Sequence, residues 1–228
     1  NTHSLITSML EILTAIVSSA ITLFIILDPL LSTSMFIDLT RGLSGKEVLK
    51  QAGIATSVAG VLMLVFLVFN DVIFSILNIE LDSFKVAGGI ILFILGLQIV
   101  LGLEIGGKAA HEARAEQARD GAELLPGTVR KSMAGVIIGT PIMCGPGTIT
   151  TVMIIGSEYG ILITAVAIIL ALLVIWMILA FSSRITAVLG ETVIVILSKI
   201  VGLLLTAIAV HTIWSGVVGL IGLTVAGL

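Results

Sequence analysis

Charged residues are scarce in this chain. They make up 11% of its 228 residues, whereas 58% are hydrophobic and the mean hydropathy is +1.27. Soluble domains carry about 25% charged residues. The scarcity therefore excludes an ordinary soluble domain and indicates an integral membrane protein. The apolar runs are about twenty residues long, which fits membrane-spanning α-helices because these satisfy their own backbone hydrogen bonds in lipid.

Other features that are absent narrow the class further. The apolar runs lack the period-2 alternation that builds a membrane β-barrel. The single cysteine, Cys144, excludes an intrachain disulfide. The sequence contains no HExxH pattern, no cluster of metal-ligand residues and no Ser/His/Asp set at one depth. We therefore expect no enzyme activity, no metal site, no cofactor and no nucleic-acid partner.

Six apolar segments are present, at 9–39, 50–70, 84–103, 132–157, 160–181 and 193–224. The one long polar stretch, 104–131, follows the third segment, and its Ala, Glu and Arg content predicts a short surface helix. We predict an all-α integral membrane protein with six transmembrane helices. Its parts are a first three-helix repeat, a cytoplasmic linker and a second three-helix repeat, at 1–103, 104–131 and 132–228.

Lysine and arginine are distributed unevenly over the connections. Those after the first, third and fifth segments hold Arg41, Lys46, Lys50, Lys108, Arg114, Arg119, Arg130, Lys131 and Arg184. The opposite side holds only Lys85. The positive-inside rule predicts that the basic connections are cytoplasmic, with both termini outside the cell membrane. Asp71, Glu80 and Asp82 are interpreted as solvated residues of the outer side.

The two halves repeat several features. Pro29 lies in LDPLLSTSMF and Pro146 in CGPGTITTVM, and Arg41 and Glu158 each lie twelve residues beyond these prolines. Twelve helical residues rise about 18 Å, which places both prolines near the midplane of a ~30 Å hydrocarbon core. Three spans per half is an odd number, so homologous halves have opposite orientations. We therefore predict an inverted repeat whose first and fourth helices are broken near the midplane.

The chemistry of such breaks suggests a binding site. A proline inside a helix removes a hydrogen bond, and in lipid the freed groups need protein or water. The new half-helix begins with unpaired amides at a positive dipole end, which suits a carboxylate. The carbonyls freed before the break can receive an ammonium group. Secondary transporters with discontinuous helices use this arrangement. The alternative is a pair of inert proline kinks relieved by Ser and Thr hydroxyls.

Asp28 is the one acidic residue that we place deep in a span, where a carboxylate is costly and usually functional. It would bind a substrate ammonium group, hold a cation or carry a proton; the alternative is a helix N-cap. The other predicted substrate-binding residues are Pro29, Ser32 and Thr33 at the first break and Gly145, Pro146, Gly147, Thr148, Thr150 and Thr151 at the second.

Polar and small residues of the third and sixth spans complete the pattern. Gln98 and His211 each follow a glycine by nine residues and are predicted to support the broken loops by hydrogen bonds across the bundle. The alternative is an interhelical bond of structural value only. Several glycines, among them Gly60, Gly88, Gly89 and Gly96, are predicted to allow close helix packing.

At this point the sequence resembles the MarC family of membrane proteins, which includes the SnatA small neutral amino acid transporters. The first-span motif of that family is similar to D-P-x-G-N-x-P-x-F followed by Leu-Thr; here DPLLSTSMF spans 28–36 and Leu39-Thr40 follows. The fourth-span motif, similar to G-P-G-x-[IT]-T-T, matches GPGTITT at 145–151. The first motif departs at Leu31, Ser32 and Ser34, where the family has Gly, Asn and Pro. Because of these departures, we expect the second motif to contribute more to substrate binding than the first.

The resemblance implies six spans, a relation to LysE-type exporters, and transport of glycine and alanine. We therefore expect a secondary transporter of small neutral amino acids that works by alternating access and is coupled to H⁺ or Na⁺. Its expected partners are a small neutral amino acid and the lipid bilayer. A passive channel built from half-helices, or an exporter of small solutes, is the alternative. Transport direction, coupling ion, exact substrate and oligomeric state are left open.

Overall fold

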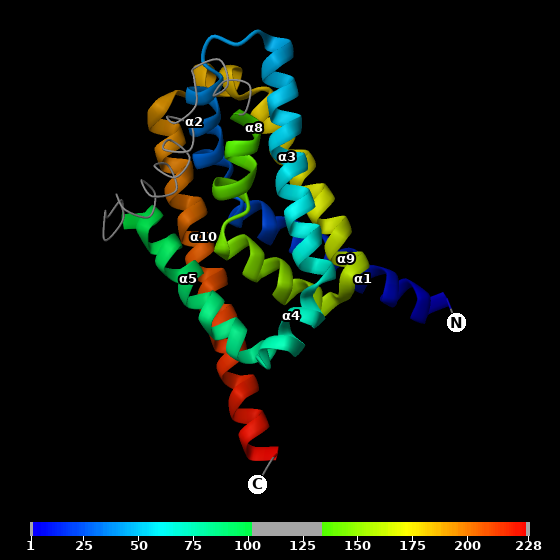
Figure 1. Cartoon of the computed structure of the whole chain (residues 1–228). Helices are drawn as coiled ribbons and strands as arrows, with labels where there is room; N and C mark the ends of the chain where they lie inside the picture. Colours follow the sequence, from blue (N-terminus) through cyan, green and yellow to red (C-terminus); the bar gives the residue numbers. More distant parts are fainter. Residues whose placement is uncertain (1, 102–133, 227–228) are drawn as a thin grey trace.

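The structure, a computed structural model, describes residues 2–101 and 134–226, and every regular element within these ranges is a helix (Figure 1). The helices are α1 (Thr2–Ile26), α2 (Pro29–Thr40), α3 (Gly45–Val68), α4 (Asn70–Leu77), α5 (Leu81–Leu101), α8 (Ala134–Ile137), the π-helix η1 (Ile138–Met143), α9 (Pro146–Ala180) and α10 (Ser182–Ala226). The surface helix predicted within 104–131 lies outside the described residues.

Five helices in the described part of the chain are long and apolar enough to cross a membrane, whereas the sequence predicted six. The difference arises at the fourth and fifth apolar segments. The fourth begins as α8 and η1, which have only 4 and 6 residues, and continues as the start of α9. Gly160 has non-helical dihedral angles (φ 82°, ψ 168°) and divides α9 into two helices there. The predicted fifth span is thus the second part of this 35-residue helix.

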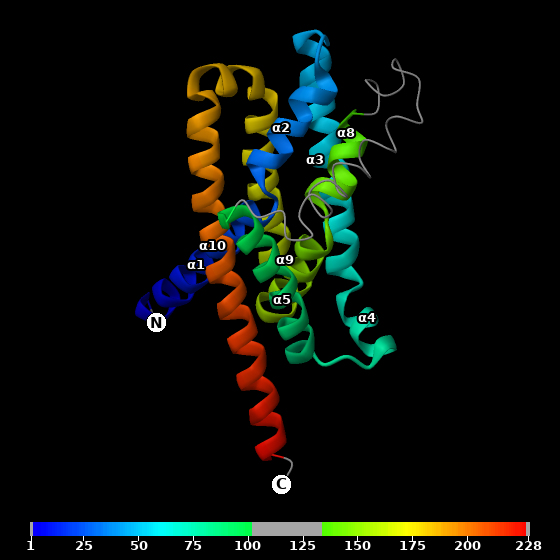
Figure 2. The same cartoon turned by 90° about the vertical axis from the view of Figure 1, so that its left-hand side faces the viewer.

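The connections separate into two ends of the bundle. The α2–α3 connection and the α9–α10 turn lie at one end, and the α4–α5 connection and the carboxyl terminus lie at the other (Figures 1 and 2). Arg41 and Arg184 therefore share an end that Lys85 does not. This arrangement agrees with the predicted separation of the basic residues.

Helix α5 runs beside the middle part of the longer helix α10 (Figure 1). Glycines on both helices make this approach possible, as the sequence predicted for α5. A Cβ atom added at Gly96 would lie 2.7 Å from the Thr206 amide nitrogen and 2.9 Å from the Gly202 carbonyl oxygen. A Cβ atom at Gly89 would lie 3.1 Å from the carbonyl oxygen of Ala209. The two backbones are therefore nearly in contact.

Two apolar cores hold the bundle together. The larger one joins α1, α2, α3, η1 and α9 and includes the fully buried side chains of Leu27, Phe36, Met63, Ile138 and Val152. The smaller one consists of Ile25, Leu92, Leu205 and Ala209 and joins α1, α5 and α10. Residues just before the first helix break contribute to both cores, so packing holds that break in place from two sides.

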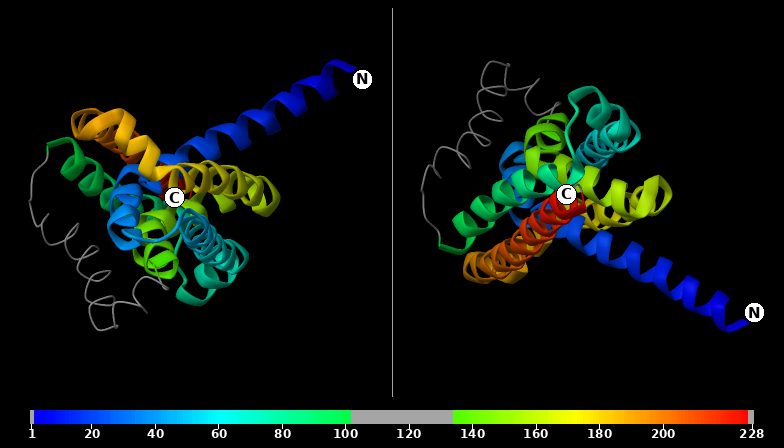
Figure 3. Two further views of the ribbon diagram at one scale, coloured as in Figure 1. Left: turned by 90° about the horizontal axis from the view of Figure 1, so that it is seen from above. Right: turned by 90° about the horizontal axis from the view of Figure 1, so that it is seen from below.

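The perimeter of the bundle is apolar. Leu162, Leu203 and Trp214 are 83%, 61% and 66% exposed, which is the pattern expected where lipid replaces water. The amino-terminal part of α1 extends outward from the other helices (Figure 3). Its Met9, Leu10 and Leu13 are exposed as well.

Candidate functional site

The first helix break lies between α1 and α2, at the position that the sequence predicted. Asp28 has φ 46°, a left-handed conformation that aspartate tolerates better than most residues. The Ser32 amide donates to the Asp28 carbonyl oxygen at 3.0 Å, so Asp28 stands at the start of α2. The Ser32 hydroxyl donates to the Leu27 carbonyl oxygen at 3.1 Å. A carbonyl that the break frees is therefore satisfied by a side chain.

The second break lies between η1 and α9, also as predicted. Gly145 is extended (φ −80°, ψ 176°), Pro146 opens α9, and the Ile149 amide donates to the Gly145 carbonyl oxygen at 3.1 Å. The Thr148 hydroxyl donates to the Met143 carbonyl oxygen at 2.8 Å across the break. The wide turn of η1 precedes the break, and π-helical turns are frequent at functional sites.

The hydrogen bonds of the two breaks follow the same offsets. In each, the residue three positions after proline donates its amide to the carbonyl just before proline. In each, the threonine four positions after proline, Thr33 or Thr150, donates its hydroxyl to the proline carbonyl. Thr151 likewise donates to the Gly147 carbonyl oxygen at 2.9 Å. These hydrogen bonds are therefore repeated where the sequence repeats, although Asp28 is left-handed and Gly145 is extended.

These hydroxyl bonds limit what the side chains can offer a ligand. A hydroxyl has one hydrogen to donate and two lone pairs to accept. The hydroxyls of Ser32, Thr33, Thr148, Thr150 and Thr151 all donate to backbone carbonyls. In this conformation they can accept from a ligand but not donate to it. A carboxylate would have to be bound by backbone amides, whereas an ammonium group could use these hydroxyl oxygens.

A small cavity brings the two breaks together. Its polar lining consists of Asp28 from the first break and Gly147 and Thr148 from the second. Its apolar lining consists of Ile26, Leu92, Leu95, Ile99 and Leu205. Gly147 and Thr148 belong to the first turn of α9, whose amides have no acceptor within the helix. The cavity volume is about 20 Å³, enough for roughly one water molecule.

The other predicted site residues lie around this cavity without lining it. Ser32, Thr33, Thr150 and Thr151 are buried. Thr150 packs against Gly88 so closely that a Cβ atom at Gly88 would overlap its methyl group. Pro29, Gly145 and Pro146 shape the two breaks.

The two predicted supporting residues differ in their placement. Gln98 is half-buried on α5, one position before the cavity-lining Ile99. His211 lies on the exposed side of α10 and is not brought to either break. Gln98 and His211 therefore do not lie at equivalent positions beside the cavity.

Sequence reasoning missed the apolar half of the cavity. Leu92, Leu95, Ile99 and Leu205 lie in uninterrupted apolar runs, where nothing distinguishes them from leucines and isoleucines that face lipid. Only the packing of α5 and α10 against the breaks identifies them.

Charged residues near the start of α5 form an ion pair that the sequence did not predict. Lys85 is 8% exposed, and its Nζ lies 2.7 Å from Glu158 Oε1 of α9. Asp82, expected to be solvated, lies with Oδ1 3.7 Å from the same Nζ, and its side chain is 24% exposed. An ion pair therefore joins the first half of the chain to the second, about two turns of α5 from Leu92.

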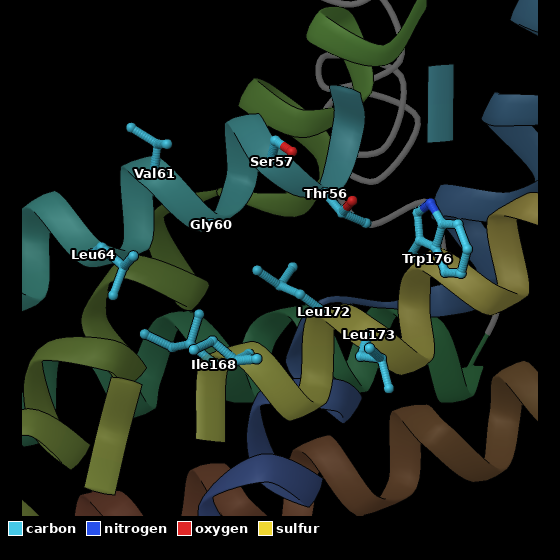
Figure 4. A pocket seen from close by; sticks show the side chains of 10 residues that line it. Thr56, Ser57, Gly60, Val61, Leu64, Ile168, Leu172, Leu173 and Trp176 are labelled. Atoms are coloured by element: carbon cyan, nitrogen blue, oxygen red, sulfur yellow. The ribbon is translucent and has the colours of Figure 1, made fainter. Parts of the chain in front are cut away.

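A wider groove lies between α3 and α9 and is separate from the breaks (Figure 4). Its volume is about 420 Å³, and it is lined by apolar residues together with Thr56, Ser57 and Trp176. The Thr56 hydroxyl donates to the Ala52 carbonyl oxygen of its own helix at 3.0 Å. None of the predicted site residues lines this groove, and no charged residue of the described part of the chain lines it.

Comparison with known proteins gives a consistent family match. The model of the MarC family of integral membrane proteins matches residues 13–221. A UPF0056 membrane protein of Aquifex aeolicus is 31% identical over 222 residues, which cover 95% of this chain and 99% of that protein. YvbG, a UPF0056 membrane protein of Bacillus subtilis, is 26% identical over 211 residues, covering 90% and 95%. No solved structure matches the chain.

Proposed function

The chain belongs to the MarC family of integral membrane proteins, and from this premise we propose that it is a secondary active transporter of small neutral amino acids such as glycine and alanine. The observation that carries the proposal is the cavity shared by Asp28, Gly147 and Thr148. A zwitterion needs an anion-binding group and a cation-binding group within a few ångströms. The first turn of α9 offers the former and Asp28 offers the latter.

The substrate carboxylate would bind the amides of Gly147 and Thr148 at the positive end of the α9 dipole. The ammonium group would bind the Asp28 carboxylate and the Thr148 hydroxyl oxygen. That hydroxyl donates its hydrogen to the Met143 carbonyl oxygen, and the lone pairs of its oxygen can accept from the ammonium group. Pro29, Ser32, Thr33, Gly145, Pro146, Thr150 and Thr151 would hold the two breaks in shape. Asp28 is also the group that would carry a coupling H⁺ or Na⁺.

Alternating access is the mechanism that we propose, and the closed geometry of the cavity supports it. A volume of about 20 Å³ does not hold an amino acid, so binding requires the breaks to separate from α5 and α10. The matched hydrogen-bond offsets support an inverted repeat of residues 1–103 and 132–228 joined by the linker 104–131. One repeat would rock against the other. The end with Arg41 and Arg184 would be cytoplasmic, and both termini would lie outside.

The test is transport by the full chain reconstituted in proteoliposomes. We expect saturable uptake of labelled glycine and alanine, and acceleration of that uptake by unlabelled substrate on the other side. Imposing proton and sodium gradients separately identifies the coupling ion. Flux that neither saturates nor shows trans-stimulation would instead indicate a passive channel, and flux only toward the outside would indicate an exporter.

Two variants test the site within the same assay. Asp28→Asn should raise the KM for glycine about tenfold or more, because it removes a charge-assisted hydrogen bond. Gly147→Leu should abolish uptake, because even a Cβ atom there would lie 2.9 Å from Leu92 Cδ2. Gly45→Leu is the matched control, since nothing lies within 4 Å of a Cβ atom at Gly45. Wild-type transport by both site variants would refute the site assignment.

A further inference from the structure

The cavity between the breaks has one polar and one apolar side. Its polar lining comes from the α1–α2 break and from the start of α9. Opposite these lie large aliphatic side chains of α1, α5 and α10. An amino acid held by its carboxylate and ammonium groups on the polar side would direct the substituent on its α-carbon toward the aliphatic side. The aliphatic side chains therefore determine which substituents fit.

Leu92 makes the closest approach among them to the α9 amino terminus. A Cβ atom at Gly147 would lie 2.9 Å from Leu92 Cδ2, compared with 3.5 Å from Leu95 Cδ1. The Leu92 side chain is only 1% exposed and packs in the smaller core with Ile25, Leu205 and Ala209. It is thus enclosed by α1, α9 and α10, and a change of rotamer would require repacking of that core.

The backbone that carries Leu92 is held in place on both sides. One turn before it, Gly88 packs directly against Thr150 of α9. One turn after it, Gly96 packs directly against Thr206 of α10. Because neither glycine has room for a Cβ atom, α5 cannot move closer to α9 at Gly88 or to α10 at Gly96. The position of Leu92 on α5 is therefore fixed by packing, and its side chain bounds the apolar side of the cavity when the breaks separate to admit a substrate.

We propose that Leu92 sets the upper limit on the size of the substrate side chain. This inference rests on the proposed function, because it assigns a selectivity role within the same cavity. Once the breaks have separated to admit the substrate, a substituent of one or two carbons fits beside Leu92, and a branched substituent collides with it. One methylene of misfit in an apolar pocket changes discrimination about 10- to 200-fold.

The experiment compares uptake of glycine, alanine, valine and leucine by proteoliposomes containing wild type or Leu92→Ala. The measured quantity is the ratio of kcat/KM for valine to that for alanine. This ratio does not depend on the fraction of protein that is folded, so a loss of yield in the variant does not affect it. We expect Leu92→Ala to raise the ratio at least about tenfold.

Two further variants complete the test. Leu92→Met, which conserves volume, should keep the wild-type ratio. Leu101→Ala on the same helix is the matched control, because Leu101 is 50% exposed and does not line the cavity. If Leu92→Ala transports nothing, Leu92→Val, which removes one methylene, is measured in its place and should shift the ratio in the same direction.

The outcomes separate this inference from the proposed function. A wild-type protein that takes up neither glycine nor alanine overturns the proposed function itself. A wild-type protein that transports alanine, together with a Leu92→Ala or Leu92→Val variant of unchanged ratio, overturns only the role of Leu92. An equal rise of the ratio in Leu101→Ala also overturns it, because the effect is then not local to the cavity.

Discussion

At the scale of single residues, Asp28 combines a backbone role with a chemical one. Its φ of 46° allows the chain to turn between α1 and α2, and the residue lines the cavity. A left-handed conformation costs an ordinary L-residue about 1–2 kcal/mol, whereas Asp and Asn adopt it more readily. The two roles can therefore be separated by choosing the substitution.

Asp28→Asn should change the free energy of unfolding little, because asparagine tolerates the same φ. Asp28→Ala should lower it by about 1–2 kcal/mol. Thermal unfolding of the two variants in the same detergent measures the difference. Equal destabilisation by Asn and Ala would mean that the carboxylate charge, rather than the backbone conformation, stabilises the break.

Thr148 is the second residue whose roles can be separated. Thr148 is 3% exposed, and its hydroxyl donates to the carbonyl oxygen of the buried residue Met143. Removing the hydroxyl takes this hydrogen bond away from a buried acceptor. Thr148→Val should lower the free energy of unfolding by about 1–3 kcal/mol. Thr148→Ser keeps the hydroxyl and should lose less than half as much. Similar losses for valine and serine would show that methyl packing, and not the hydrogen bond, matters here.

At the scale of helices, the contact between α5 and α10 depends on the absence of side chains. A Cβ atom at Gly96 would collide with backbone atoms of Thr206 and Gly202, which cannot move without moving α10. Gly96→Ala should therefore destabilise the protein by about 1–3 kcal/mol, the usual cost of overpacking.

The matched control for Gly96 is Gly45→Ala. Gly45 is the first residue of α3, and nothing lies within 4 Å of a Cβ atom there. That substitution should be neutral or stabilising by about 0.4–1 kcal/mol, because alanine restricts the unfolded chain. Both melting temperatures are measured in one detergent. A Gly96→Ala melting temperature at or above that of Gly45→Ala would contradict the close contact between α5 and α10.

At the scale of the whole molecule, the ion pair of Lys85 and Glu158 joins the two halves of the chain. The side chain of Lys85 is 10% exposed and that of Glu158 is 37% exposed. Removing the Glu158 carboxylate leaves the buried Lys85 ammonium group with one ionic contact among the described residues, Asp82 Oδ1 at 3.7 Å. Removing the ammonium group leaves a carboxylate that water can reach. The two deletions should therefore have unequal costs.

Glu158→Gln should lower the free energy of unfolding by about 1–2 kcal/mol, between the values for exposed and buried pairs. Lys85→Met, which keeps an apolar stem, should cost less. Unfolding of both single variants and the double variant gives the coupling energy of the pair. If Lys85→Met lowered the free energy of unfolding more than Glu158→Gln, the unequal burial of the two side chains would not account for the costs.

Several features could be predicted from the sequence because they depend on local properties. Low charge and long apolar runs predict membrane-spanning helices, and Pro29 and Pro146 predict where two of them break. The six predicted spans differ from the five candidate helices because α9 counts as a single helix, although Gly160 interrupts its helical conformation. A glycine in an apolar run does not by itself indicate whether it will interrupt a helix. That the threonines bind substrate stays a prediction; their hydroxyls donate to the nearest backbone carbonyls, as the alternative of proline kinks relieved by hydroxyls also predicts.

The sequence by itself determined the class of protein, the helical content and the two breaks, because hydropathy and proline act through neighbouring residues. Only the tertiary structure decided that Asp28 shares a cavity with Gly147 and Thr148, that Leu92 closes its apolar side, and that Lys85 is buried against Glu158. These contacts join residues that are distant in the chain. They arise from the way in which α5 packs between α9 and α10, and no local pattern specifies that packing.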